Sequence, residues 1–242
     1  SGCDLFIYVG GESDAWVDDA LKEAVNKNMI VLNLMDILGE RAKAEETVEG
    51  MQAEEEEGEA GEEPEYDEHV WLSLRNASVF CDAIAGALAT LDPGNAETYR
   101  ANCEAYIEKL GALDAGYESA VQNAKLKTVL FADRFPFRYL ADDYGLTYYA
   151  AFVGCSAETE ASFETVVFLA GKADELGLPA VLVIENSDGK IAKAIASNIS
   201  NPDIPILTMD SMQSVTSADA AGGKTYLGIM QGNLETLRRA LG

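Results

Sequence analysis

The chain has 242 residues, a formal net charge of −25 and a hydrophobic fraction of 48%. This length and composition suit one large globular domain or two smaller lobes, and no run of about 18 apolar residues is present to cross a membrane. Binding to phosphates requires a basic surface, so the charge excludes nucleic acid from the expected partners.

The predicted elements begin at once with a βαβ unit. Residues 4–11 form an apolar run that ends in two glycines, residues 12–28 have the apolar spacing of a helix, and residues 29–34 are a second strand. No signal peptide precedes the first strand, which leads us to expect a processed or trimmed chain.

An acidic segment follows, roughly over residues 39–67. Residues 40–68 contain fourteen acidic and two basic residues, so about half of the net charge lies there. The segment has few aromatic or branched side chains and cannot bury enough apolar surface to offset the entropy lost on ordering. We therefore expect an acidic loop that is mobile or disordered. It ends just before His69, the only histidine of the chain.

Two helices come next. Residues 73–91 are amphipathic, with Ser73 as the expected N-cap, and the sequence DPGN at 92–95 ends that helix. Residues 96–125 form the longest helical pattern of the chain. A helix of that length reaches about 45 Å at 1.5 Å per residue, which is too long for one small lobe and suits a link between two.

The remainder alternates between strands and helices. The expected strands are 127–132, 146–152, 179–185 and 204–210, and the expected helices are 135–145, 160–177, 189–199 and 225–242. We predict an α/β fold of two lobes with parallel sheets, bridged by one long backbone helix, with the first lobe incomplete. The predicted boundaries are 1–95, 96–125 and 126–242. Ligands of such folds bind at the carboxyl ends of the strands.

The four cysteines are Cys3, Cys81, Cys103 and Cys155. They are widely spaced and form no C-x-x-C pair, which argues against a metal cluster or a redox motif. Free buried thiols are favoured over one or two disulfides.

Several stretches resemble one protein family in their order and spacing. These are CDLFIYVGGESDAWVDDAL, DEHVWLSLRNA, DPGNAETYRANCEAYIEKLGALD, FRYLADDYGL and TYLGIMQGNLETLRRAL. Together they resemble the zinc/manganese-type (cluster A-I) solute-binding proteins of bacterial metal ABC transporters, over essentially the whole chain. The family carries a flexible acidic loop, often rich in histidine, at the position where this chain has a loop without histidine.

The resemblance implies two α/β lobes, a long backbone helix and a zinc or manganese ion held in the cleft. It also implies an ABC transporter permease in the membrane as the partner, and an extracytoplasmic location with a lipoprotein anchor in the full-length form. We expect a monomer. The family normally begins with another strand and helix that carry a first histidine ligand, and this chain begins after that point.

The family's ligand positions fall on different residue types here. Its second histidine falls on His69, its third on Arg134, and its late carboxylate on Asp210. A guanidinium stays protonated and cannot bind a metal ion. The resemblance therefore implies His69 and Asp210 as metal ligands, with Asp133 as the substitute beside Arg134.

Each of these residues also has a plainer interpretation. His69 can be a helix-start histidine bonded to the local backbone, and Asp210 can cap the next turn. Arg134 can point outward, pair with Asp210 in place of the metal, bind an anionic group of another solute, or form a surface salt bridge. Glu185 can line the cleft, while the three residues that follow it suit the cap of the next helix.

The aromatic residues 135–149 are spaced as core residues of a helix and the next strand, which we favour over an aromatic solute pocket. An enzyme is not indicated. A nucleophilic triad would need His69, no G-x-S-x-G elbow exists, and no carboxylate pair is singled out for glycoside chemistry.

We predict the extracytoplasmic solute-binding component of an ABC transporter for zinc or manganese. The alternative is a degenerate relative that binds a non-metal solute or acts as a scaffold.

Overall fold

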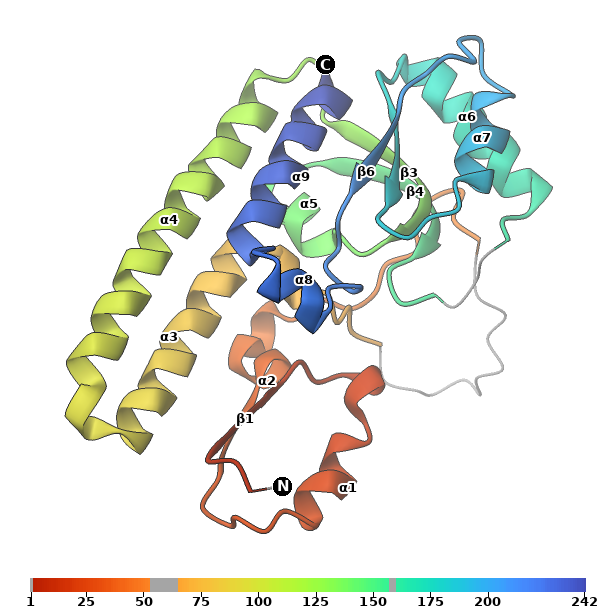
Figure 1. Cartoon of the computed structure of the whole chain (residues 1–242). Coiled ribbons are helices and arrows are strands. Elements are labelled where there is room, and N and C mark those ends of the chain that lie inside the picture. The colour runs from red at the N-terminus through yellow and green to blue at the C-terminus, as the bar shows by residue number, and fades with distance from the viewer. Residues whose placement is uncertain (1, 53–64, 157–159) are drawn as a thin grey trace. The chain divides into compact units, whose positions relative to one another are not determined.

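The computed structural model of the protein describes residues 2–52, 65–156 and 160–242 (Figure 1). These residues form two compact units. Unit 1 holds the described residues of Ser1–Glu45 and Glu63–Asp114, and unit 2 holds those of Glu46–Glu62 and Ala115–Gly242. The long helix α4, Ala96–Asn123, has residues in both units.

Unit 1 contains the predicted βαβ unit. Strands β1 (Leu5–Tyr8) and β2 (Ile30–Asn33) pair in parallel, and α1 (Val17–Lys22) lies between them in the sequence. The short 3-10 helix η1, Glu12–Asp14, precedes α1.

Helix α1 is much shorter than the helix predicted over residues 12–28. The chain leaves the helix at Glu23, and the side chain of Asn26 then donates hydrogen bonds to the carbonyl of Cys3 at 3.1 Å and to Asp4 at 3.0 Å. Asparagine side chains compete in this way with helical hydrogen bonds. The apolar spacing of this segment therefore overestimates the helix.

Two short helices after β2 were not predicted. They are α2 (Leu34–Leu38) and the 3-10 helix η2 (Gly39–Arg41). The side chain of Asn33 caps α2 by accepting hydrogen bonds from the backbone N–H groups of Met35 at 2.9 Å and Asp36 at 3.2 Å. Asn33 was assigned to the strand, whereas it ends the strand and begins a helix.

Helix α3 of unit 1 agrees with the sequence prediction. After the 3-10 helix η3 (Val70–Leu72), α3 covers Leu74–Leu91 and is capped by Ser73, whose side chain accepts a hydrogen bond from the N–H of Asn76. The 3-10 helix η4, Pro93–Asn95, separates α3 from α4.

Unit 2 is built on a parallel sheet of four strands in the order β4-β3-β5-β6. The strands are β3 (Thr128–Phe135), β4 (Thr147–Val153), β5 (Val181–Ile184) and β6 (Ile206–Met209). The helices are α5 (Arg138–Tyr144), α6 (Phe163–Leu176), α7 (Lys190–Ala196), α8 (Ser217–Ala221) and α9 (Tyr226–Leu241). Figure 1 shows α6 and α7 on one side of the sheet and α5 and α9 on the other. The predicted α/β class, with parallel sheets and one long helix, is confirmed.

The core of unit 2 fills both faces of this sheet. On one face, buried residues of β3 and β5 pack with α6 and α7, among them Leu130, Val181, Leu169 and Ile195. The aromatic residues on and around α5 are core residues, as predicted, because Phe135, Phe137, Tyr139 and Tyr148 are all buried.

The described part of the acidic segment is folded. In unit 1, Ala44 bridges to Tyr66. In unit 2, the carboxylate of Glu46 accepts hydrogen bonds from Arg138 at 2.6 Å and Tyr148 at 3.1 Å, and the N–H of Gln52 donates to the carbonyl of Ala151 at 2.9 Å. The expectation of a mobile segment is therefore wrong for residues 39–52. The rest of the predicted loop, residues 53–64, lies outside the described residues.

The four cysteines are free thiols, with Cys3 exposed and the others partly exposed. Burial, followed by a hydrogen bond with Asp82, raises the pKa of Cys103 to about 11. This thiol is protonated at neutral pH, which makes it a poor nucleophile.

One buried hydrogen bond joins the end of α4 to α9. The hydroxyl of Tyr117, a fully buried residue, donates to the carbonyl of Met230 at 2.7 Å. We expect Tyr117→Phe to lower the free energy of unfolding by about 0.5–1.5 kcal/mol, because the mutant loses this bond and keeps the ring. Thermal or urea unfolding measures the change.

Tyr106→Phe on the same helix is the control, because its hydroxyl has no hydrogen bond to the described residues. It should change stability by less than about 0.5 kcal/mol. An equal loss in the two variants would show that the Tyr117 bond is not the cause.

Candidate functional site

The sheet of unit 2 changes direction between β3 and β5. The chain passes from β3 to β4 at one edge and then returns to β5 on the other side of β3. In parallel sheets, ligands bind outside the carboxyl ends of the strands at such a switch point. A cavity of about 440 Å³ lies there, lined by Asp133, Arg134, Phe152, Ile184, Glu185, Asn186, Ser187, Asp188, Ile191, Gln213 and Ser214.

A β-bulge places Asp133 and Arg134 at this cavity. Phe131 lies opposite Ala150 and Arg134 opposite Phe152, so two residues of β3 face the single residue Ala151 of β4. Bulges redirect side chains and are frequent beside functional sites. Strand β3 thus continues to Phe135, beyond the end predicted at residue 132.

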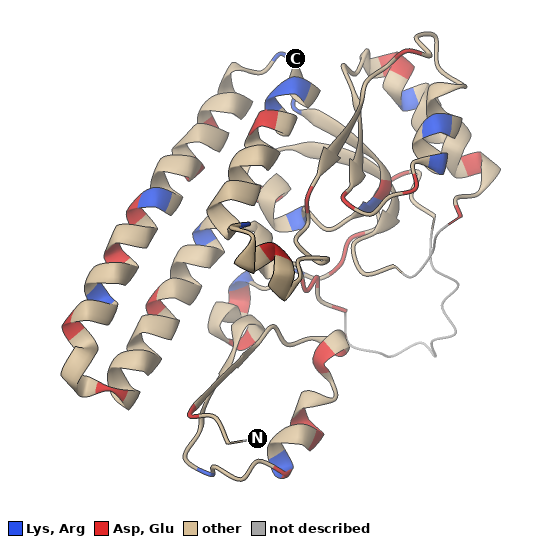
Figure 2. Cartoon of the chain, in the orientation of Figure 1, with Lys and Arg blue, Asp and Glu red and all other residues tan. Residues whose placement is uncertain are grey.

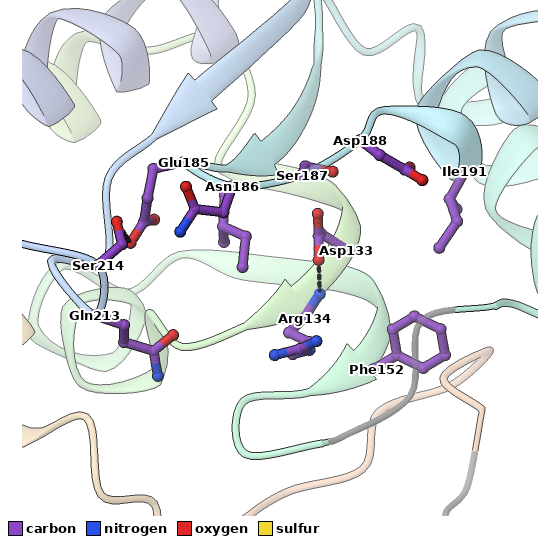
Figure 3. Close-up of a pocket in the computed structure, with 11 residues that line it drawn as sticks. Asp133, Arg134, Phe152, Glu185, Asn186, Ser187, Asp188, Ile191, Gln213 and Ser214 are labelled. Atoms are coloured by element: carbon purple, nitrogen blue, oxygen red, sulfur yellow. Dashed lines mark hydrogen bonds between the residues drawn. The ribbon is translucent and has the colours of Figure 1, made fainter.

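The carboxylate of Asp133 turns back onto the backbone. It accepts a hydrogen bond of 2.9 Å from the N–H of Arg134, as Figure 3 shows. The two residues that the sequence singled out as a pair therefore both line the cavity.

Arg134 is a cation without a complete set of partners. Its Nε atom is buried and has no hydrogen-bond partner in the described part of the chain. Figure 3 shows its guanidinium among the side chains that surround the cavity. Asp210, the partner proposed for it in one interpretation, is paired with Lys224 instead.

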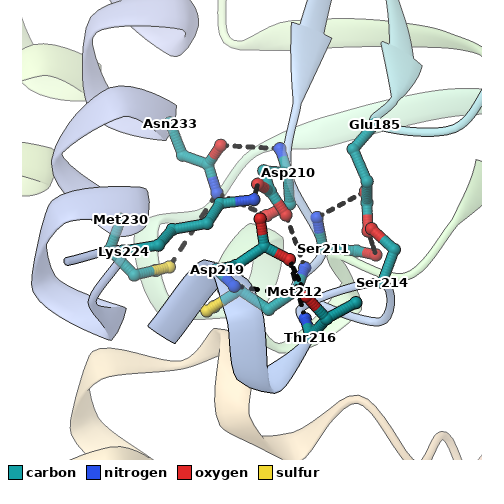
Figure 4. Close-up of polar contacts among 10 residues, drawn as sticks. All are labelled: Glu185, Asp210, Ser211, Met212, Ser214, Thr216, Asp219, Lys224, Met230 and Asn233. Atoms are coloured by element: carbon teal, nitrogen blue, oxygen red, sulfur yellow. Dashed lines mark hydrogen bonds and ion pairs between the residues drawn. The ribbon is translucent and has the colours of Figure 1, made fainter. Parts of the chain in front are cut away.

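Glu185 lines the same cavity and connects two loops. Its carboxylate accepts hydrogen bonds from the N–H of Ser211 at 2.8 Å and from the hydroxyl of Ser211 at 2.9 Å, and a longer one from Ser214 (Figure 4). These bonds tie the residue after β5 to the segment after β6.

The residues after Glu185 were predicted to cap the next helix, but the N-cap of α7 is Gly189, and Asp188 precedes it. The carboxylate of Asp188 accepts a hydrogen bond of 2.9 Å from the N–H of Lys190, at the start of α7, and pairs with the ammonium group of the same lysine at 2.6 Å. The side-chain hydrogen bond with Lys190 lowers the pKa of Asp188. Acidic residues recur in the loops after the strands of unit 2, as Figure 2 shows.

Asp210 follows β6 and is fully engaged. One carboxylate oxygen accepts a hydrogen bond of 2.8 Å from the N–H of Met212, which has a positive φ of 66°, and the other lies 3.0 Å from the ammonium group of Lys224. The side chain of Asn233 bonds both backbone groups of Asp210 at 2.8 Å (Figure 4).

These contacts match the plainer interpretation of Asp210 as a turn cap. The hydrogen bond with Asp210 also raises the pKa of Lys224. A metal ion at Asp210 would have to compete with this ammonium group. Asp210 lies outside the lining of the cavity that holds Asp133 and Glu185.

His69 belongs to unit 1 and is 2% exposed. One carboxylate oxygen of the equally buried Asp67 lies 2.8 Å from the backbone nitrogen of His69 and 2.9 Å from its Nδ1 atom. With the proton on Nδ1, the lone pair of the imidazole is on Nε2. Histidines that bind metals are commonly oriented by a carboxylate in this way.

The predicted residues fall into separate groups. Asp133, Arg134 and Glu185 lie together in unit 2, Asp210 lies with Lys224, and His69 lies with Asp67. No three His, Cys, Asp or Glu side chains of the described residues gather as metal ligands. Among the described residues no helix is long and apolar enough to cross a membrane.

The sequence interpretation missed two partners. Asp67 stands two residues before His69, and this Asp-x-His spacing was a signal that could have revealed the pair. Lys224 is fourteen residues from Asp210, and no pattern in the sequence connects them. Lys224 reaches Asp210 only through the fold of the segment that includes α8.

Comparison with known proteins shows the family. The family of the periplasmic component A of zinc-uptake complexes (ZnuA) matches residues 1–240. The zinc-binding protein AdcA of Streptococcus pyogenes serotype M3 is 28% identical over 240 residues, which cover 97% of this chain and 46% of that protein. The zinc-binding lipoprotein AdcA of Streptococcus pneumoniae serotype 4 is 28% identical over 237 residues, 98% of this chain and 45% of that protein. The chain thus spans about half the length of these curated relatives.

Solved structures agree with the sequence match. The Zn(II)-bound ZnuA-like domain of Streptococcus pneumoniae AdcA has a TM-score of 0.71 and 25% identity, covering 99% of this chain and 80% of that one. The metal-dependent lipoprotein YcdH from Bacillus subtilis has a TM-score of 0.74 and 26% identity, with the same coverage. The chain belongs to the family of the periplasmic zinc-uptake component A.

Proposed function

We propose that this chain captures a divalent transition metal, zinc first, as the extracytoplasmic solute-binding component of an ABC transporter. The observation that carries the proposal is the family match over residues 1–240. Two findings support zinc as the cargo. The AdcA relatives are named zinc-binding proteins, and the structure of the ZnuA-like domain of one AdcA is Zn(II)-bound. The protein binds and releases the ion and performs no chemical step.

The partners follow from the same proposal. The bound ion is handed to a permease in the membrane, and the full-length protein is a lipoprotein, as the relative from Streptococcus pneumoniae is named. A single copy of the chain carries the site. Nucleic acid has no part in this function, because the net charge of −25 repels phosphate.

Within this proposal His69 is the principal ligand. Zinc binds imidazole nitrogen and carboxylate oxygen, and His69 is the only imidazole of the chain. Its orientation by Asp67 supports the role. Asp133 and Asp210, which the family resemblance implies, are the proposed carboxylate ligands.

The first test is calorimetric titration of the metal-stripped chain with zinc and then with manganese. We expect one-to-one zinc binding that is tighter than manganese binding, as the usual order of divalent affinities requires. His69→Ala should weaken zinc binding by more than about 100-fold, because it removes the ligand itself. Loss of a group that only hydrogen-bonds to a metal ligand already lowers metal affinity by about 10- to 100-fold. Weak binding at many sites, unchanged in His69→Ala, would mean that only the acidic surface is sensed.

Asp67 provides a second test. We expect Asp67→Asn to weaken zinc binding by roughly 10- to 100-fold, because a neutral amide orients the imidazole less firmly and lowers its basicity. Glu68→Gln is the matched control, since it removes the charge of the neighbouring residue, whose side chain bonds Ser13 rather than His69. Equal losses in the two variants would assign the effect to general charge.

The role of Asp210 as a metal ligand is tested by removing the ammonium group of Lys224, which pairs with its carboxylate. We expect Lys224→Met to strengthen zinc binding by about two- to fivefold, because breaking a partly exposed ion pair frees the carboxylate. Lys190→Met, which breaks the Asp188 pair, is the control and should have no effect. Unchanged binding in Lys224→Met would remove Asp210 from the ligand set.

The second candidate function is capture of a non-metal solute by a degenerate family member. One observation favours it, because Arg134 stands in the cavity at the position of a family ligand. Failure of zinc binding in the first titration, in a chain that is folded by circular dichroism, would select it.

A further inference from the structure

The cavity at the switch point contains charges of both signs. Arg134 supplies a guanidinium, and Asp133, Glu185 and Asp188 supply carboxylates. The charge of Asp188 is offset by Lys190 at 2.6 Å. Glu185 accepts its hydrogen bonds from neutral serine groups, and Asp133 accepts one from a backbone N–H.

Two buried side-chain nitrogens have no hydrogen-bond partner among the described residues, the Nε atoms of Arg134 and Arg138, and of these two residues only Arg134 lines the cavity. Buried polar groups are almost always hydrogen-bonded, and an exception in a cavity points to a partner that arrives with a ligand. The β-bulge that redirects Arg134 is a second, independent sign of a functional position.

The mixture of charges favours a ligand that carries both signs. The guanidinium cannot coordinate a metal ion, so a bare cation leaves Arg134 without a partner from the ligand. A simple anion at Arg134 would lie in the same cavity as the carboxylates of Asp133 and Glu185. A solute that carries a carboxylate and a positive centre satisfies both sets of groups. A volume of about 440 Å³ is within the range of small-molecule sites.

We propose that this cavity of unit 2 binds a small solute that combines a carboxylate, held by the guanidinium of Arg134, with a positive centre facing Asp133 and Glu185. The neutral side chains of Asn186 and Gln213 line the same space. The positive centre has two sources, the ammonium group of an amino acid or a metal ion chelated by a carboxylic acid. The second source rests on the proposed function and means that zinc is taken up together with its chelator.

Equilibrium dialysis of the full chain distinguishes the sources. One arm uses a radiolabelled mixture of the twenty amino acids without metal. The other arms use radiolabelled citrate with and without zinc, and labelled zinc alone. We expect either the amino-acid label to be retained, or the citrate label to be retained only when zinc is present.

Arg134→Gln should reduce retention of the carboxylate label by roughly 10- to 100-fold, as expected for loss of a charge-assisted, two-pronged contact. Arg134→Lys, which keeps the charge and loses the fork, should show a smaller loss. Arg100→Gln, an exposed change of equal charge in α4, is the matched control and should bind like the parent chain. Thermal unfolding confirms that each variant is folded.

The outcomes separate the two proposals. Retention of zinc alone, equal in the parent and Arg134→Gln, with no retention of any carboxylate, overturns this inference and leaves metal capture standing. Retention of amino acids without zinc binding supports the inference and overturns metal capture. Carboxylate retention that is unchanged in Arg134→Gln, or equal in Arg100→Gln and Arg134→Gln, also overturns the assignment to Arg134.

Discussion

The pairing of β3 with β4 on one side and with β5 on the other is the constraint on which unit 2 depends. It makes β3 a central strand that helices cover on both faces, and its residues Leu130, Phe131 and Ala132 are almost completely buried. The same pairing creates the switch point at the carboxyl ends of β3 and β5. Asp133, Arg134 and Glu185 reach one cavity because they follow those two neighbouring strands.

The excess of acidic over basic residues explains many of the other polar contacts of the structure. The chain has 42 acidic and 17 basic residues, so basic partners are scarce. Several carboxylates near the cavity are therefore satisfied by neutral donors, as Glu185 is by Ser211 and Asp133 by a backbone N–H. The few cations are placed at particular carboxylates, with Lys190 on Asp188, Lys224 on Asp210 and Arg138 on Glu46. Against this background Arg134 is informative, because it lines the cavity and its Nε has no hydrogen-bond partner in the described part of the chain.

The sequence predicted the regular part of the structure because parallel strands are continuous apolar runs and helix ends carry recognisable caps. Ser73 begins α3 as expected, and Gly177 ends the helix predicted over residues 160–177, with a φ of 60°. The end of α1 was missed because the partners of Asn26, which are Cys3 and Asp4, are supplied by the fold. The end of β2 was missed although Asn33 caps α2 through local hydrogen bonds from the N–H groups of Met35 and Asp36.

The candidate site was predicted less completely for a related reason. The family resemblance singled out Asp133 and Arg134, the end of a predicted strand singled out Glu185, and the three residues line one cavity. The partners that decide the chemistry of the other candidates depend on loop conformation. Lys224 pairs with Asp210 across the irregular segment that joins β6 to α9. The contact of Asp67 with His69 lies directly before the 3-10 helix η3.

The bulge in β3 has a consequence for how such proteins diverge. The identity of the side chain at the cavity depends on one extra residue between Phe131 and Arg134. Loss of a single codon there would restore regular pairing and leave one residue of β3, in place of two, opposite Ala151 of β4. The two residues are Ala132 and Asp133, so a deletion of that kind can remove the Asp133 carboxylate from the cavity while Arg134 keeps its pairing with Phe152. Ligand preference on this scaffold can therefore shift by insertion and deletion as readily as by substitution.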